Sequence, residues 1–214
     1  MEDVLDLYAE PPDPARPVVC LDERPLVLHD HVRSPVPPAP GRVAREDDEY
    51  RRCGSGCLAL AFSPGACWRH ACWRHAWVGE RRTWANFAGW VRELLDVHYP
   101  AAEVVRLVVD NRNTHHARAL YEAFPADEAR RLVQRIEWHD TPTHRSWLNM
   151  VELELSVLTG QCLDRRLPSL AVVTPEVAAW EREHHAAGAT VTWQFITTVA
   201  RTKLQRLDPQ PIHK

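Results

Sequence analysis

The sequence contains no apolar run close to the ~18 consecutive residues typical of a membrane-spanning helix. Its first residues are acidic and carry no basic cluster, so a secretory signal peptide is not expected. Lysine is nearly absent, since only Lys203 and Lys214 occur and arginine supplies the other basic side chains. The formal net charge of −3 gives no overall attraction to nucleic acid. A polyanionic partner would therefore have to be held by a local basic patch or by metal ions.

Cysteine is too sparse for a disulfide scaffold, because six residues are spread over a chain of 214. Cys20 and Cys162 lie in apolar surroundings and are predicted to be small buried side chains. A reducing cytoplasm is the expected compartment. The length and an apolar fraction of 45% predict one domain, or one domain with tails, that buries a substantial core.

Two short apolar runs end abruptly in acidic residues. Asp110 directly follows the run at residues 104–109, and Asp22 directly follows the run at residues 17–21. Each run has the length of a buried strand, and the polar residues after Asp110 favour a turn or a helix start. Ligands of α/β proteins bind at the carboxyl ends of such strands. An acid that merely begins a loop is the alternative for either position alone.

Carboxylates on paired strands repel one another unless a cation lies between them. Oxygen ligands of this kind favour Mg²⁺. A third carboxylate, Glu152, lies in the first turns of a helix predicted from Trp147 to about Leu158. It is a candidate third metal ligand, although an acid near a helix N-terminus also stabilises the helix without any metal.

The rest of the pattern alternates strands and helices. Further helices are predicted at residues 3–9, 83–97 with Thr83 as N-cap, 114–124, 126–135 and 175–187, and further strands at 26–29, 57–62 and 136–139. Residues 54–56 are predicted to be a glycine turn. Residues 33–49 are proline-rich and then charged, which predicts an exposed excursion. Residues 200–207 are basic, and a solvated helix face is favoured there over a contact with DNA.

Residues 66–75 repeat the five residues Ala-Cys-Trp-Arg-His exactly. Cysteine and histidine are zinc ligands, so the repeat offers the candidate ligands Cys67, His70, Cys72 and His75. Their spacing is tighter than in common zinc motifs, and a simple duplication in a strand or loop is the favoured interpretation. An extra copy within the third strand would shift the pairing register of that strand.

Three segments resemble the acidic motifs of DDE transposases, most closely those of the bacterial insertion-sequence branch of the Tc/mariner superfamily. They are residues 18–23 (Val-Val-Cys-Leu-Asp-Glu), 110–115 (Asp-Asn-Arg-Asn-Thr-His) and 146–152 (Ser-Trp-Leu-Asn-Met-Val-Glu). Weaker similarity extends over most of the chain, through residues 119–125, 155–158, 161–166 and 191–195. The order of the predicted elements is that of an RNase H-like fold. The predicted fold class is α/β, with a central mixed five-stranded sheet flanked by helices.

The resemblance implies a function in DNA transposition. Asp22, Asp110 and Glu152 would be the catalytic acids and would bind two Mg²⁺ or Mn²⁺ ions about 4 Å apart. The expected partners are the transposon ends and the target DNA, with a homodimer on DNA and no membrane partner. The expected location is the cytoplasm, at the nucleoid.

The resemblance also implies a division of the chain. Residues 1–16 would be an inter-domain helix and linker, residues 17–167 the catalytic domain, and residues 168–214 a helical extension. Family members are longer and carry an N-terminal helix-turn-helix region, so a truncated member is expected. Two alternatives stay open, namely a DNA-binding remnant without catalysis and a general RNase H-like nuclease.

Overall fold

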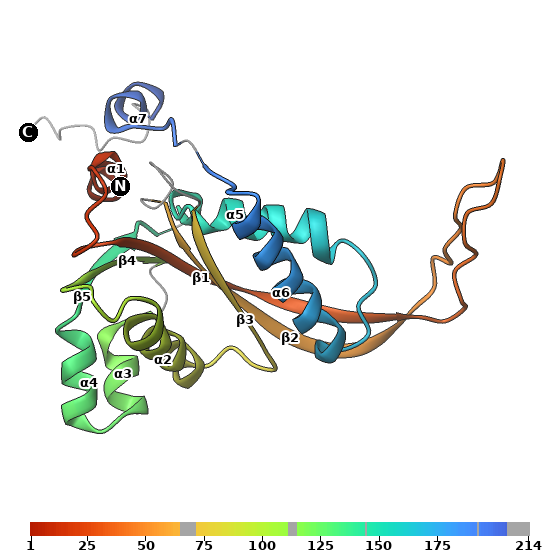
Figure 1. The fold of residues 1–214 in the computed structure, drawn as a ribbon, viewed down its shortest axis with the longest axis horizontal. Helices are drawn as coiled ribbons and strands as arrows, with labels where there is room; N and C mark the ends of the chain where they lie inside the picture. The colour runs from red at the N-terminus through yellow and green to blue at the C-terminus, as the bar shows by residue number, and fades with distance from the viewer. Residues whose placement is uncertain (65–71, 111–114, 144, 192, 205–214) are drawn as a thin grey trace, which may run out of the picture.

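The computed structural model describes residues 1–64, 72–110, 115–143, 145–191 and 193–204. Five strands form one mixed sheet in the order β3-β2-β1-β4-β5 (Figure 1). β1 pairs antiparallel with β2 and parallel with β4, β2 pairs antiparallel with β3, and β4 pairs parallel with β5. The strands are β1 (Val18–His31), β2 (Tyr50–Ser63), β3 (Trp73–Gly79), β4 (Val105–Asp110) and β5 (Ile136–Thr141). The predicted mixed five-stranded sheet is confirmed.

Helices cover both faces of this sheet (Figure 1). One face carries α2 (Trp84–Glu93), its π-helical continuation η2 (Leu94–His98), α3 (Ala117–Ala123) and α4 (Ala126–Val133). The other carries the 3₁₀ turn η3 (Ser146–Leu148), α5 (Val151–Leu158), the π-helical turn η4 (Thr159–Leu163) and α6 (Leu170–Ala186). The terminal helices α1 (Glu2–Ala9) and α7 (Thr197–Lys203) pack against each other.

Alternate side chains of the central strands enter two separate cores. Val19 and Leu21 of β1 lie in the core beneath α2, α3 and α4, whereas Val18 and Cys20 lie in the core beneath α5 and α6. Because both faces of the sheet are buried, the central strands are continuously apolar rather than alternating. This explains why the two predicted runs were recognisable in the sequence.

Two predicted strand boundaries are wrong, because β1 and β2 form one long antiparallel pair. β1 continues past Asp22 to His31, so the separate strand at residues 26–29 is part of it. Pro25 is tolerated there because β1 pairs with β4 only from Val18 to Cys20, which leaves one side of β1 without a strand at Pro25.

The predicted glycine turn at residues 54–56 is also wrong. These residues continue β2, and Gly54 adopts a φ of 110° beside a register shift at Leu28 and His29 of β1. Glycine supplies the positive φ that such an irregularity requires. β1 and β2 are instead connected by the exposed excursion that was predicted at residues 33–49 (Figure 1).

The remaining helices differ from the predictions mainly at their ends. Thr83 caps α2 as predicted, its hydroxyl accepting a hydrogen bond from the backbone N–H of Asn86. α3 begins at Ala117, three residues later than predicted, and residue 114 lies outside the described part of the chain. α6 begins at Leu170 rather than at Pro175, so this proline lies inside the helix. None of the helices among the described residues is long and apolar enough to cross a membrane.

α6 also covers the open edge of β3. The backbone N–H of Arg74 donates to Nε2 of His185 at 3.1 Å, and the backbone N–H of Ala76 donates to the carboxylate of Glu181 at 3.1 Å. These contacts occupy donors that an exposed edge strand would offer to another chain. β3 is therefore a protected strand, and it pairs with β2 in unbroken register from Trp73 to Gly79.

Candidate active site

The register of β1 and β4 brings two of the predicted acids level with each other. Cys20 pairs with Val108, and Asp22 and Asp110 each lie two residues further along their own strand. Cys20 and Val108 face the core beneath α5 and α6, so the alternation of side chains turns both acids toward that same face. Asp22 and Asp110 are only 1% and 6% exposed. Asp22 lies inside β1 rather than at its end, which corrects the prediction of two strand-terminal acids.

Glu152 reaches this region from the first turn of α5, and its side chain is half-buried. Burial and then the charge of Asp110 raise the pKa of Asp22 to about 7, and the charges of Glu23 and Glu152 act in the same direction. A hydrogen bond from the backbone N–H of Glu23 opposes this shift. Asp110 and Glu152 therefore both lie within electrostatic range of Asp22.

Asn149 fixes the start of α5 against β1. Its side-chain amide donates to the backbone carbonyl of Leu21 at 3.1 Å, and Asn149 is fully buried. At the other end of the helix, Arg24 donates to the hydroxyl of Thr159 at 2.6 Å. In β1, Leu21 comes directly before Asp22, and Arg24 follows Asp22 by two residues. The two contacts therefore set the position of Glu152 relative to Asp22.

Replacing Asn149 with alanine is expected to lower the free energy of unfolding by about 1–3 kcal/mol, because the buried Leu21 carbonyl loses its donor. Chemical denaturation followed by circular dichroism measures this change. Ser156→Ala, on an exposed position of α5, serves as the control and is expected to change stability by less than about 0.5 kcal/mol. Equal effects of the two replacements would contradict the anchoring role of Asn149.

His115 and Glu23 are functional candidates to which the sequence assigned no role. The fully buried His115 forms ion pairs through Nδ1 with Asp110 and through Nε2 with Glu23, the latter at 2.7 Å. Burial lowers the pKa of His115, but hydrogen bonds to Asp110 and Glu23 outweigh it and raise the pKa to about 9. A histidine five residues after Asp110 was the available signal, but only the fold shows that it bridges two strands.

The donor set fits hard divalent cations. Asp22, Asp110 and Glu152 offer carboxylate oxygens, the ligands that Mg²⁺ and Mn²⁺ prefer. Burial first, and then the neighbouring negative charges, raise the pKa of Asp22, and a divalent cation stabilises carboxylates that are buried close together.

One cavity lies away from these acids. It has a volume of about 770 Å³ and lies near the amino ends of β1 and β4, where Val18 and Arg106 line it together with Tyr8 and Trp193. None of the three acids contributes to its wall. The carboxylate site is therefore separate from this cavity.

The other sequence candidates have different outcomes. Cys67 and His70 lie outside the described residues, Cys72 is buried, and His75 forms ion pairs with Glu181 and Glu93.

In the basic segment at residues 200–207, Arg201 of α7 pairs with Glu2 of α1 at 2.6 Å, which favours a structural role for Arg201. Residues 205–207 of that segment lie outside the described part.

The strand order, with acids on the first and fourth strands and on a helix after the fifth, defines an RNase H-like α/β protein. A model of the DDE superfamily endonucleases matches residues 17–173. The chain belongs to this family.

Two solved structures share the fold. The crystal structure of the Mos1 strand transfer complex has a TM-score of 0.54 and 18% identity, over 87% of this chain and 54% of that chain. The Mos1 transposase paired-end complex with left transposon end has a TM-score of 0.54 and 20% identity, over 87% of this chain and 55% of that chain. This chain therefore spans about half the length of those chains. The comparison with curated proteins finds no match.

Proposed function

We propose that this chain is the catalytic domain of a DNA transposase, which cleaves DNA phosphodiesters and joins the released ends to target DNA. The proposal is supported most by the register that sets Asp22 of β1 level with Asp110 of β4, and by Glu152 of α5 lying within electrostatic range of Asp22, in a chain of the DDE endonuclease family. The Mos1 neighbours, named as a transposase and its strand transfer complex, support the choice of transposition over other nuclease reactions.

The three acids would hold two Mg²⁺ or Mn²⁺ ions, which supply charge stabilisation and an activated nucleophile for in-line displacement at phosphorus. The residues of the chain itself have positioning roles. Asp22 and Asp110 are fixed by the sheet, and Glu152 is fixed by the anchored start of α5. His115 restrains Asp110 and Glu23 through its two ring nitrogens. Little reorganisation of these side chains is then needed when the substrate binds.

DNA is the proposed partner, and the net charge of −3 means that metal ions and local arginines would have to attract it. We further propose a homodimer on DNA, since a Mos1 structure is described as a paired-end complex. The proposed place of action is the nucleoid in the cytoplasm.

The proposal is tested by incubating the purified chain with duplex DNA and Mg²⁺ or Mn²⁺ and following nicking and strand transfer on gels. Asp110→Asn is expected to lower the rate at least about a hundredfold, because a metal ion contributes several kcal/mol of transition-state stabilisation. Asp127→Asn replaces an exposed acid of α4 and is expected to leave the rate unchanged.

Three outcomes would overturn the proposal. Cleavage that persists in Asp110→Asn would place the chemistry elsewhere. Salt-dependent DNA binding without cleavage in either metal would identify a non-catalytic DNA-binding remnant. Cleavage of RNA–DNA hybrids without any joining to target DNA would identify a general RNase H-like nuclease.

A further inference from the structure

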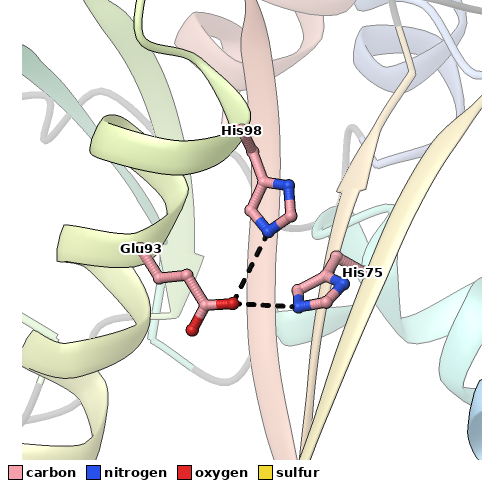
Figure 2. A group of neighbouring side chains, drawn as sticks. All are labelled: His75, Glu93 and His98. Carbon is pink, nitrogen blue, oxygen red and sulfur yellow. Dashed lines mark ion pairs between the residues drawn. The ribbon is translucent and has the colours of Figure 1, made fainter.

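A second group of potential metal ligands lies on the opposite face of the sheet from Glu152. It consists of His75 on β3, Glu93 at the end of α2 and His98 at the end of η2. Figure 2 shows the rings of both histidines turned toward the same carboxylate oxygen of Glu93. Oε1 of Glu93 lies 3.3 Å from Nε2 of His75 and 3.7 Å from Nε2 of His98.

These separations are close to those around a bound transition metal. A tetrahedral Zn²⁺ with bonds of about 2.0–2.1 Å holds its ligand atoms about 3.4 Å apart. The three ligand atoms all lie within 4.8 Å of one another, so only small side-chain rotations separate the present arrangement from that geometry. Two imidazoles and one carboxylate are also a known zinc ligand set that leaves a fourth position for water.

The local backbone explains why Glu93 and His98 share one side of their helix. In a regular α-helix, residues five apart point about 140° away from each other. The π-helical turn η2 contains five residues and widens the helix here, with the backbone N–H of Tyr99 bonded to the carbonyl of Leu94 at 2.9 Å. The wider turn brings residues five apart nearer to the same side.

Two ligands are held in the required orientation by groups behind them. Nδ1 of His75 is hydrogen-bonded to Glu181 at 3.2 Å, which leaves Nε2 directed at the cluster. The indole N–H of Trp77 donates to Oε2 of Glu93 at 2.9 Å, which leaves Oε1 for the cluster. Metal-bound histidines and carboxylates commonly have such supporting partners.

His98 has a different environment. Among the residues that the structure describes, no group forms a hydrogen bond with its Nε2, although this atom is shielded from solvent. The ring of Trp73 packs against it with a centroid separation of 5.0 Å. A shielded ring nitrogen without a hydrogen bond is unfavourable, and a metal ion between it and Glu93 would satisfy it.

We propose that His75, Glu93 and His98 bind one Zn²⁺ ion, through Nε2, Oε1 and Nε2, and so connect the edge strand β3 to the end of α2. His75 belongs to the second copy of the five-residue repeat, so the repeat contributes to this site with one histidine and the helix supplies the other ligands. The site is separate from the three acids, and the proposal does not depend on the proposed function.

The test titrates ZnCl₂ into EDTA-treated, desalted protein by isothermal titration calorimetry and follows the thermal unfolding midpoint with and without zinc. One equivalent of Zn²⁺ is expected to bind and to raise the midpoint. His75→Ala, His98→Ala and Glu93→Gln are each expected to weaken binding at least about a hundredfold, and Glu181→Gln by about 10–100-fold, because it supports His75 from behind. Circular dichroism of each variant in EDTA checks folding. Two folded variants among those of His75, Glu93 and His98 are enough to show whether these residues bind the zinc.

Two controls separate this site from the alternatives. His70→Ala changes the equivalent histidine of the first repeat copy and is expected to keep full zinc affinity. Asp110→Asn removes an acid of the candidate active site and is also expected to keep it. Wild-type protein that binds no zinc would overturn the proposal, as would binding that survives His98→Ala and Glu93→Gln. Loss of binding in His70→Ala would place the ligands in the repeat, and loss in Asp110→Asn would place them among the three acids.

Discussion

Replacing Asp22 with asparagine is expected to stabilise the metal-free protein at pH 8 while abolishing DNA cleavage. The folded-state pKa of Asp22 is about 7, against an ordinary value of 3.8, because the carboxylate is buried near Asp110, Glu23 and Glu152. Each unit of pKa difference corresponds to 1.36 kcal/mol, so the ionised Asp22 costs on the order of 4 kcal/mol in the folded state. Asparagine has a similar shape and carries no charge.

The sign of this effect sets its pH dependence. The folded protein holds a proton on Asp22 more tightly than the unfolded chain does, so the favourable contribution is complete below about pH 4. It is lost as the pH rises from about 4 to 7. The difference between Asp22→Asn and the wild type should therefore be small at pH 4 and largest at pH 8. Urea denaturation in EDTA at several pH values measures it.

Asp96 provides a control for which the same replacement is expected to change stability in the opposite direction. A hydrogen bond from Arg131, at 2.7 Å, lowers the pKa of Asp96, so its ionised form stabilises the fold above the ordinary pKa. Asp96→Asn is expected to lower stability at pH 8, where Asp22→Asn raises it. Addition of Mg²⁺ should stabilise the wild type and leave Asp22→Asn nearly unchanged. Destabilisation by Asp22→Asn at pH 8 in EDTA would show that the charge of Asp22 is already compensated.

The sequence predicted the central strands and two of their acids because the sheet is buried on both faces. Residues 104–109 and 17–21 are continuously apolar for that reason, and the change to acidic residues after them is sharp. The same logic failed beyond Asp22. The residues that follow it include Glu23 and Pro25, which interrupt the apolar pattern, and only the pairing with β2 keeps them in a strand.

The roles of the other candidate site residues depend on contacts between distant parts of the chain. His115 was visible within a motif, but its second partner, Glu23, lies on another strand 92 residues away. The repeat likewise suggested His75 as a metal ligand, whereas its neighbours Glu93 and His98 lie outside the repeat and are brought toward one side of their helix by the π-helical turn. Local patterns identify such residue types, whereas the partner of each is set by the tertiary fold.

The buried ion pair between Arg74 and Glu154 is the other place where a large effect is expected. Arg74 is 1% exposed and Glu154 is 3% exposed, and the guanidinium contacts the carboxylate at 2.5 and 3.2 Å. Removing one partner leaves an uncompensated buried charge. Arg74→Met and Glu154→Leu are therefore each expected to lower the free energy of unfolding by about 3–5 kcal/mol, measured by urea denaturation.

The double variant Arg74→Met/Glu154→Leu is expected to be more stable than either single variant, because no buried charge is left unpaired. Recovery should be incomplete, since Arg74 also donates to the backbone carbonyls of Cys72 and Ala189, at 3.0 and 3.3 Å. A double variant as unstable as the sum of the two single variants would show that the pair is not the coupled unit described.

The same pair connects the repeat to the candidate active site. Arg74 lies in the second repeat copy, and Glu154 follows Glu152 by two residues on α5, where it turns toward β3. The pair therefore restrains the rotation of α5 about its axis, which determines where Glu152 points. We expect the double variant to recover stability but not Mg²⁺-dependent cleavage, because apolar side chains at positions 74 and 154 fill the space without fixing that rotation. Full cleavage in a stable double variant would mean that Asn149 and Arg24 alone are sufficient to position Glu152.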